Sequence, residues 1–255
     1  MVELKTAASI DAMREAGRVV AQALTAVRES AAVGVSLLEL DTIAHDVLRA
    51  AGATSPFLGY RPSFAPTAYP AVLCTSVNDA IVHGIPTDYR LRDGDLLSAD
   101  FGAELDGWVG DSAVSMIVGS PRPADERLIR TAERALEAGI AAAVVGNRIG
   151  DISHAVGTVC RAAGYGVPHG FGGHGVGRRM HEDPDVPNEG RPGRGFPLRE
   201  GMVLAIEPML IASGRDGYHP APDGWTLVTD DGSRAAHAEH TVAITEAGPR
   251  ILTAL

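Results

Sequence analysis

Cysteine and positive charge are both scarce in this sequence. Its 255 residues include only two cysteines, Cys74 and Cys160, too few for a disulfide framework, and this favours a reducing compartment. Lys and Arg number 22 against 32 Asp and Glu, and the formal net charge is -10. This negative net charge argues against general electrostatic binding of nucleic acid, because phosphate binding requires clustered Lys and Arg. We expect no DNA partner, and only a local contact with RNA stays open.

Long hydrophobic runs are absent as well. No segment approaches the roughly 18 uninterrupted apolar residues of a membrane helix. The N-terminal segment MVELKTAASIDAMREAGR contains acids early and has no apolar run of the length found in signal peptides. We therefore expect a cytoplasmic protein without a membrane partner.

Several common catalytic patterns are missing too. The sequence contains no nucleophile elbow, and GFGGHG at 170–175 matches a dinucleotide fingerprint without the strand, turn and helix that such a motif needs. Cys74 and His83 could form a thiol protease pair, but no orienting Asn or Asp accompanies them. These absences argue against nucleophilic or dinucleotide chemistry.

Hydrophobic residues make up 45% of the chain, enough for a full core. Apolar residues recur at helical spacing over 9–30 and again over about 124–143. Ser36 and Glu39 form a capping box that opens a second helix, which ends near Gly52. Because strand-like runs separate these helical stretches, we expect an α/β or α+β protein.

One helical segment occurs twice. Residues 33–53 align with residues 145–165, 112 positions later, and each copy follows a long helical stretch. A chance match between two alanine-rich helices is the alternative. A true duplication implies one catalytic domain over 1–255, with halves of about 1–120 and 121–255 that share a central sheet, and a site at their join. The proline-rich segments 61–70 and 183–197 are expected as loops near that site.

The segment DFGAELDGWVGD, residues 100–111, is predicted to be a hairpin with two acids. Its turn signal is Asp106-Gly107. This turn makes Asp100 and Asp111 diagonal neighbours on one face of the sheet, because side chains alternate with a period of two. Two carboxylates on an apolar sheet repel each other and lose hydration, so they require a shared proton or a cation. The alternative is that one of them is exposed at a strand end.

Further candidate ligands lie in apolar strand-like runs. GMVLAIEPM at 201–209 ends at Glu207 and AAHAEHTVAIT at 235–245 contains Glu239, although a salt bridge to Arg would explain either acid. GGHGVGRRMHEDP supplies His174, for which a surface position is the alternative. Four carboxylates and one imidazole would suit a pair of divalent ions that share a bridging water.

These residues belong to segments that resemble a known family. The chain resembles the type I methionine aminopeptidases of the pita-bread fold, which prolidases and aminopeptidase P share. The resemblance spans essentially the whole chain, in the order and with the spacing of the family. The matching segments are NDAIVHGIP at 78–86, DFGAELDGWVGD at 100–111, GGHGVGRRMHEDP at 172–184, AIEPM at 205–209 and AEHTVAIT at 238–245.

The resemblance implies two pseudo-symmetric halves, a curved, mostly antiparallel sheet covered by helices, and a site with two divalent ions (Co, Mn, Fe or Zn). The implied metal ligands are Asp100, Asp111, His174, Glu207 and Glu239. Asp111 and Glu239 would bridge the ions, and a bridging hydroxide would attack the peptide. His83 and His181 would contact the substrate, and Glu207 would transfer the proton. The implied activity is excision of the initiator Met ahead of a small second residue.

The resemblance also implies a methionine pocket. Its residues would be Tyr60, Tyr69, Cys74, Met180 and Trp225, with Phe57 at the margin. Aromatic rings and sulfur form an apolar slot that suits a thioether, although core packing explains these residues almost as well. Met180 replaces an aromatic residue that is frequent in the bacterial family, and a longer 61–70 segment makes Tyr69 a less secure assignment than Cys74.

An Xaa-Pro aminopeptidase or prolidase uses the same ligand set and is the principal alternative. Cys74, Met209 and Trp225 favour methionine. A binding module on the same fold that lacks activity is the other alternative, and the complete ligand set argues against it. The expected partners are the N termini of nascent polypeptides, with ribosome association as a further expectation, and we expect a monomer.

Overall fold

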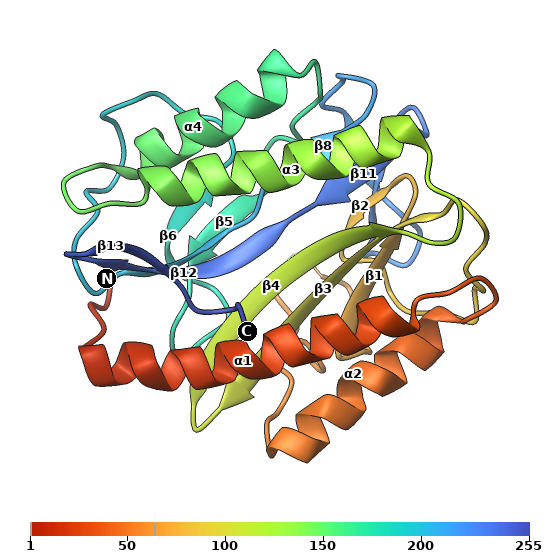
Figure 1. Ribbon diagram of the computed structural model, residues 1–255, viewed down its shortest axis with the longest axis horizontal. Helices are drawn as coiled ribbons and strands as arrows, with labels where there is room; N and C mark the ends of the chain where they lie inside the picture. The colour runs from red at the N-terminus through yellow and green to blue at the C-terminus, as the bar shows by residue number, and fades with distance from the viewer. Residues whose placement is uncertain (1, 64) are drawn as a thin grey trace.

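The computed structural model describes residues 2–63 and 65–255, which form four helices and thirteen strands (Figure 1). The helices are α1 (Ala7–Ser30), α2 (Leu37–Ala51), α3 (Pro123–Ala142) and α4 (Ile149–Ala162). The strands are β1 (Leu73–Val77), β2 (Ala80–Val82), β3 (Leu96–Leu105), β4 (Trp108–Ile117), β5 (Gly172–Gly175), β6 (Glu182–Pro187), β7 (Val203–Ile206), β8 (Met209–Ile211), β9 (Tyr218–Pro220), β10 (Leu227–Thr229), β11 (Ala235–His237), β12 (Glu239–Thr245) and β13 (Gly248–Ile251). No described helix combines the length and the apolar character that a membrane span requires.

The main sheet contains eight strands in the order β1-β3-β4-β12-β7-β5-β6, with β13 paired to β12. Every pairing between these strands is antiparallel. Strands from the first and second halves of the chain meet where β4 pairs with β12. Two small sheets, β2-β10-β9 and β11-β8, lie beside the main sheet. The expected α+β class with a shared antiparallel sheet is confirmed.

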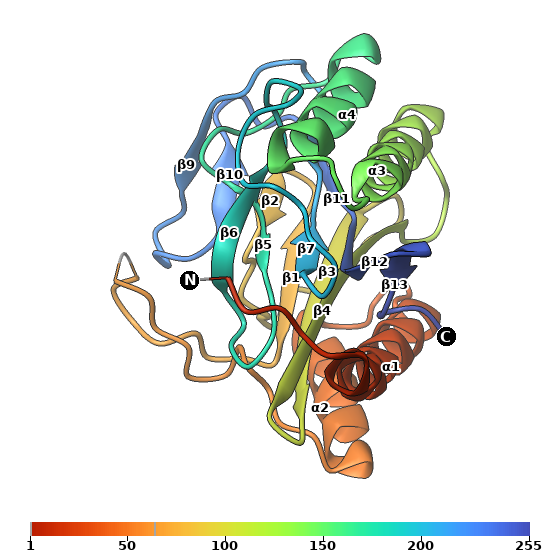
Figure 2. The same cartoon turned by 90° about the vertical axis from the view of Figure 1, so that its left-hand side faces the viewer.

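The helices lie along one side of the main sheet, and the opposite side faces β9 and β10 (Figure 2). Helices α1 and α2 bury leucines and valines against apolar residues of β3, Phe101 among them. Helices α3 and α4 do the same against Leu204 and Ile206 of β7. Because strand residues alternate between faces, Asp100 beside Phe101 and Ala205 between Leu204 and Ile206 face away from the helices.

The two copies of the repeated segment adopt similar local structures. Gly34 and Gly146, which precede α2 and α4, have φ angles of 91° and 94°. Ser36 and Glu39 form the expected capping box on α2. In α4 the equivalent of Ser36 is an arginine, and its backbone N–H donates to Asp151 at 2.7 Å. Of the two capping-box residues of α2, only the acid therefore has an equivalent in α4. The duplication of the chain stays a prediction.

The predicted acidic hairpin is confirmed by β3 and β4. Asp106 and Gly107 have φ angles of 52° and 74°, the two positive values that a tight type I′ turn requires. The turn fixes the register, in which Gly102 pairs with Asp111 and Asp100 pairs with Ala113.

Two sequence expectations were wrong in part. Segment 183–197 was expected to be a loop, but residues up to Pro187 belong to β6. This strand lies at the edge of the sheet, where proline is tolerated because one row of backbone groups has no strand partner. The single strand expected over 235–245 is divided at Ala238, whose N–H donates to the Pro208 carbonyl (3.2 Å) while β11 pairs with β8. The described residues of 61–70 contain no helix or strand, and Phe64 lies outside the described residues.

Helix α1 approaches β4 through two glycines. A Cβ atom added to Gly110 would lie 3.0 Å from the Gly17 Cα atom, and one added to Gly17 would overlap the Leu252 carbonyl oxygen. We expect Gly17→Ala to lower the free energy of unfolding by roughly 1–3 kcal/mol, because this overlap outweighs the better helix propensity of alanine. Urea unfolding measures the change. Gln22→Ala on the exposed face of the same helix is the control and should stay within about 0.5 kcal/mol of wild type. Equal stability of Gly17→Ala and wild type would contradict the close contact between Gly17 and the Leu252 carbonyl oxygen.

Candidate active site

The candidate acids lie in two neighbouring cross-strand rows on the face of the sheet away from the helices. In the first row, Asp100 of β3 pairs with Ala113 of β4, which pairs with Glu239 of β12. Adjacent strands are about 4.8 Å apart, so the backbones of Asp100 and Glu239 lie only about 10 Å apart. Asp111 precedes Ala113 by two residues and points to the same face.

The second row joins Asp111 to the second half of the chain. The Asp111 N–H donates to the Thr241 hydroxyl at 2.9 Å, and this hydroxyl donates to the Asp111 carbonyl at 2.8 Å. Thr241 pairs with Ala205 of β7, which pairs with His174 of β5. Glu207 follows Ala205 by two residues, just beyond the end of β7. Five strands thus present four carboxylates and one imidazole to a single place.

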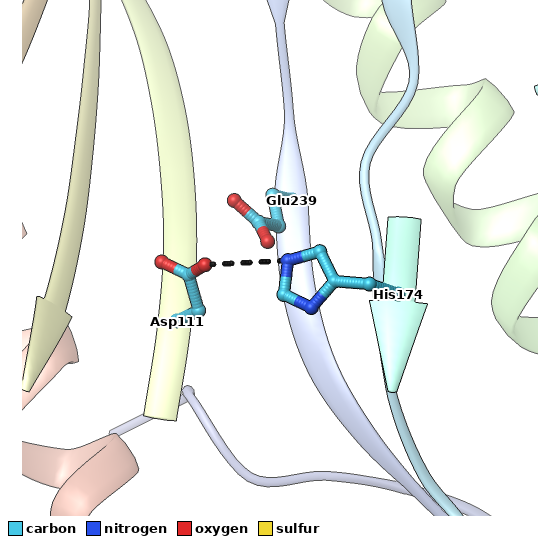
Figure 3. A group of neighbouring side chains, drawn as sticks. All are labelled: Asp111, His174 and Glu239. Carbon is cyan, nitrogen blue, oxygen red and sulfur yellow. Dashed lines mark ion pairs between the residues drawn. The ribbon is translucent and has the colours of Figure 1, made fainter. Parts of the chain in front are cut away.

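The side chains converge closely (Figure 3). The His174 Nε2 atom lies 3.8 Å from Asp111 Oδ2 and 3.7 Å from Glu207 Oε1. Ligand atoms of Asp111, His174 and Glu239 all lie within 4.8 Å of one another. These three residues are buried, with 3%, 6% and 2% of their surfaces exposed. The alternative in which Asp111 is exposed at a strand end is therefore wrong.

The buried acids have no positively charged partner among the described residues. Asp100 Oδ1, Asp111 Oδ1 and Glu239 Oε1 are buried without a hydrogen-bond partner in the described chain. Among the described residues, Glu207 and Glu239 form ion pairs with histidines alone. The salt bridge to Arg that could have explained either acid therefore does not occur there. Burial raises the pKa of Asp100 to about 7 and that of Glu207 to about 8. It also raises the pKa values of Asp111 and Glu239, and repulsion from neighbouring acids adds to both.

The protonation of His174 is fixed by its backbone surroundings. Its Nδ1 atom lies 2.9 Å from the Gly175 carbonyl oxygen, which can only accept a hydrogen bond, so Nδ1 carries the proton. Burial lowers the pKa of His174 to about 3, and the ring is neutral. The Nε2 lone pair therefore faces two carboxyl groups, and this arrangement is repulsive unless a proton or a metal ion lies between them. The oxygen-rich set with one nitrogen fits divalent transition metal ions.

His237, which was not among the residues predicted from the sequence, belongs to the same cluster. Its side chain is almost fully buried, and Nε2 lies 3.4 Å from Glu207 Oε2 and 4.0 Å from Glu239 Oε2. Ligand atoms of Glu207, His237 and Glu239 form a second group within 4.8 Å. A sequence signal was available, because His237 precedes Glu239 by two residues and a period of two places both on one face.

A cavity of about 530 Å³ opens over the cluster. The five predicted ligands contribute to its lining. So do both predicted substrate-contacting histidines, His83 and His181, and every residue of the predicted side-chain pocket, namely Phe57, Tyr60, Tyr69, Cys74, Met180 and Trp225. The structure therefore brings together all the site residues predicted from the sequence, including Tyr69 after the longer 61–70 segment.

His83 follows β2 in a left-handed conformation, with a φ angle of 60°. Residues other than glycine rarely adopt this conformation, and it often marks a functional position. The ring makes no hydrogen bond with the described chain, and the following turn is held instead by Gly84, whose N–H donates to the Ser76 hydroxyl at 3.1 Å. Burial lowers the pKa of His83 to about 4, so the ring is neutral.

His181 lies at the mouth of the cavity between two rings. It stacks on Tyr60 with 5.4 Å between ring centroids, and its centroid lies 4.2 Å from that of His174. Solvent reaches the His181 ring, but the cavity walls surround it with protein atoms, and this partial burial lowers its pKa. Tyr60 thus packs against a neutral imidazole at the entrance.

The turn that contains Met180 and His181 is anchored by an ion pair. The Lys5 ammonium lies 2.8 Å from Glu182 Oε2, and the Lys5 side chain is 3% exposed. The other oxygen of Glu182 accepts hydrogen bonds from the backbone N–H groups of Arg178 and Arg179, at 2.8 and 3.1 Å. The N-terminal segment before α1 therefore fixes the turn that closes one side of the cavity.

The remaining cavity wall is aromatic and contains one thiol. Tyr69 and Trp225 pack edge to face with 5.1 Å between centroids, and the Tyr69 hydroxyl donates to the Gly84 carbonyl at 2.8 Å. Cys74 pairs with Asp100 across β1 and β3, which places the thiol beside the acids. Burial raises the pKa of Cys74 well above its usual value, so the thiol is not a ready nucleophile.

Comparison with known proteins gives a consistent assignment. Residues 11–246 match metallopeptidase family M24. A methionine aminopeptidase of Mycobacterium tuberculosis is 53% identical over 260 residues, which cover 99% of this chain and 95% of that protein. The methionine aminopeptidase of Aquifex aeolicus is 44% identical over 100% of this chain and 99% of its own length.

Solved structures agree with the observed fold. The crystal structure of the methionine aminopeptidase of Thermotoga maritima superposes with a TM-score of 0.95 and 40% identity over the whole of both chains. A prolidase of Pyrococcus horikoshii superposes with a TM-score of 0.76 and 22% identity over 98% of this chain and 63% of the prolidase, a likeness of fold alone. The chain therefore belongs to metallopeptidase family M24.

Proposed function

We propose that the chain is a metal-dependent methionyl aminopeptidase, which hydrolyses the bond after an N-terminal Met when the second residue is small. The observation that supports this proposal best is the position of the carboxylate and imidazole cluster, at the base of a cavity whose wall contains aromatic rings, Cys74 and Met180. The identity to methionine aminopeptidases over the whole chain supports the same activity.

Two divalent ions would share Asp111 and Glu239, with Asp100 on one ion and His174 and Glu207 on the other. Fe, Mn, Co and Zn ions all accept such ligands. When bound, the ions would supply hydroxide near neutral pH and would polarise the scissile carbonyl group. The buried oxygen atoms without hydrogen-bond partners fit this role, because ligation would satisfy them.

Side chains at the edge of the cluster would transfer the proton and contact the substrate. Glu207 keeps 12% of its side chain exposed and can accept a proton from water and release it to the departing amine. His181 at the mouth can donate a ring N–H to the carbonyl oxygen of the substrate as charge develops there. His83 is a second neutral imidazole on the cavity lining and can contact the scissile amide nitrogen.

The substrate side chain would lie against the aromatic part of the wall. Thioethers pack favourably against aromatic rings, and Trp225, Tyr69 and Cys74 form an apolar surface beside the acids. Tyr60, stacked on His181, would border the position of the second residue. Substrates would be the N termini of nascent polypeptides in the cytoplasm, with the chain acting as a monomer that can associate with ribosomes.

Peptides that differ in their first two residues test the activity. We expect the metal-loaded protein to remove Met from Met-Ala and Met-Gly peptides, with Met-Leu cleaved at least about 100-fold more slowly because its larger second side chain must fit beside the cavity mouth. Release of free amino acid is measured by chromatography. Peptides that begin Xaa-Pro, with first residues other than Met, are the comparison. Faster cleavage of these peptides would identify an Xaa-Pro peptidase instead.

Substitution of the shared acids tests the metal centre. We expect Asp111→Asn or Glu239→Gln to lower turnover by roughly three orders of magnitude, because a shared ligand contributes several kcal/mol to transition-state stabilisation. Bound metal, measured by elemental analysis, should fall in parallel. Asp106→Asn makes the same chemical change in the exposed turn of the same hairpin and should leave both quantities unchanged. Full activity of Asp111→Asn would remove the basis for a shared ligand.

The raised pKa values predict how pH affects the metal-free protein. The folded-state pKa values of Asp100 and Glu207 are about 7 and about 8, whereas unfolded carboxyl groups titrate near pH 4. Between these limits the unfolded chain releases protons that the folded chain keeps, so the free energy of unfolding falls as pH rises.

We expect the melting temperature with a chelator present to fall by roughly 10 °C between pH 5 and pH 8. Excess Mn²⁺ should reverse most of this loss, because the ion replaces the protons. Glu207→Gln removes one of the titrating groups and should make the decline shallower. A metal-free protein that is as stable at pH 8 as at pH 5 would contradict the assigned proton uptake.

A further inference from the structure

We propose that His237 is a positioning residue that donates a hydrogen bond from Nε2 to Glu207 Oε2 and so orients this carboxylate toward the metal centre. The inference rests on the proposed function, because it assigns Glu207 to the metal ligands. It adds a residue that lies outside the five ligands and the two substrate-contacting histidines.

His237 occupies a third row on the face that bears the ligands. Ser98 pairs with Ser115 across β3 and β4, two residues along each strand from Asp100 and Ala113. The His237 N–H donates to the Ser115 hydroxyl at 3.0 Å, and this hydroxyl lies 2.7 Å from the His237 carbonyl oxygen. On its other side His237 pairs with Met209 of β8. Both neighbouring strands therefore fix the backbone of His237.

The imidazole of His237 points toward Glu207. Its Nε2 atom is buried without a hydrogen-bond partner in the described chain and lies 3.4 Å from Glu207 Oε2. The other oxygen, Oε1, lies 3.7 Å from His174 Nε2. Each oxygen of Glu207 thus faces a different imidazole, and a carboxylate that binds an ion through Oε1 keeps Oε2 for a hydrogen bond.

The two imidazoles differ in the atom that can carry the proton. The Gly175 carbonyl holds the proton of His174 on Nδ1, which leaves the Nε2 lone pair for a metal ion. No acceptor in the described chain holds the proton of His237 on Nδ1, so Nε2 can carry it. An ionised Glu207 oxygen can only accept. A distance of 3.4 Å slightly exceeds a formed hydrogen bond, and a small rotation of the Glu207 carboxylate brings the atoms within range.

A hydrogen bond of this kind affects metal binding more than stability. A ligating carboxylate that is held in orientation binds its ion more tightly, and loss of such a partner typically lowers metal affinity by about 10–100-fold. Glutamine at position 237 can supply an amide N–H at a similar reach, whereas leucine fills the space without a donor. The shorter amide of asparagine does not span the same distance.

The test measures Co²⁺ binding to the metal-free, full-length protein by titration calorimetry, together with the number of imidazole nitrogens bound to Co²⁺ by X-ray absorption. We expect His237→Leu and His237→Asn to weaken Co²⁺ binding by about 10–100-fold and His237→Gln to restore it to within about threefold. The count of imidazole nitrogens should be the same in wild type and His237→Gln. His240→Leu removes a neighbouring, partly buried histidine that bonds to Thr253 and should bind Co²⁺ like wild type.

Three results would overturn the assignment, and they point to different errors. Unchanged Co²⁺ affinity in folded His237→Leu and His237→Asn would show that the imidazole does not position Glu207. Loss of one bound imidazole nitrogen in His237→Gln would make His237 a direct ligand rather than a positioning residue. Failure of the wild-type protein to bind Co²⁺ would overturn the metal centre itself, and with it the proposed function.

Discussion

Repulsion among four closely placed carboxylates, two of them buried and two partly buried, is the constraint on which the site depends. Asp100, Asp111 and Glu239 project from adjacent strands whose pairing fixes the distances between them. The strands cannot separate to relieve the repulsion without losing the pairing that joins β3, β4 and β12. The charges are therefore neutralised in place, by protons or by cations. The raised pKa values describe the first state, and the neutral His174, whose Nε2 lone pair faces the acids, is suited to both because this lone pair can accept a proton or bind a cation.

The fold separates charge from substrate recognition. The five predicted metal ligands come from the main sheet or, for Glu207, from the end of β7, and a period of two and fixed registers set their positions. The aromatic wall comes from segments outside the main sheet, because Trp225 lies before β10 and donates through Nε1 to the Thr67 carbonyl at 3.1 Å. The turn with Met180 and His181 depends on the contact between Lys5 and Glu182, made by residues far apart in sequence. Changes in these segments can alter substrate selection while the ligand positions on the sheet stay unchanged.

The sequence predicted local features well and non-local ones poorly. The hairpin register followed from Asp106 and Gly107, because a two-residue turn and the alternation of side chains leave little freedom. The break at Ala238 could not be predicted, since it depends on a hydrogen bond to Pro208, about thirty residues earlier in the chain. The residue types and the strand patterns grouped Glu207 and Glu239 with the other candidate ligands but left each open to a salt bridge, and the resemblance then implied their roles as metal ligands. His237 was missed because neither argument singled it out.

Departures from ordinary local rules gather around the cavity. Among the described residues, five buried side-chain atoms lack a hydrogen-bond partner, and four of them belong to Asp100, Asp111, His237 and Glu239. His83 adopts a left-handed conformation without glycine and also lines this cavity. Each departure costs folding free energy that a purely structural core would avoid. Departures away from the cavity are fewer and include Asn78, which has a φ angle of 58°, and the buried Thr75 hydroxyl, which has no hydrogen-bond partner in the described chain. Unpaired polar groups are expected to gather in one cavity when a bound ligand, rather than the folded chain, supplies their partners. The ligand then interacts with atoms that the chain leaves unpaired, and this interaction adds to its binding free energy.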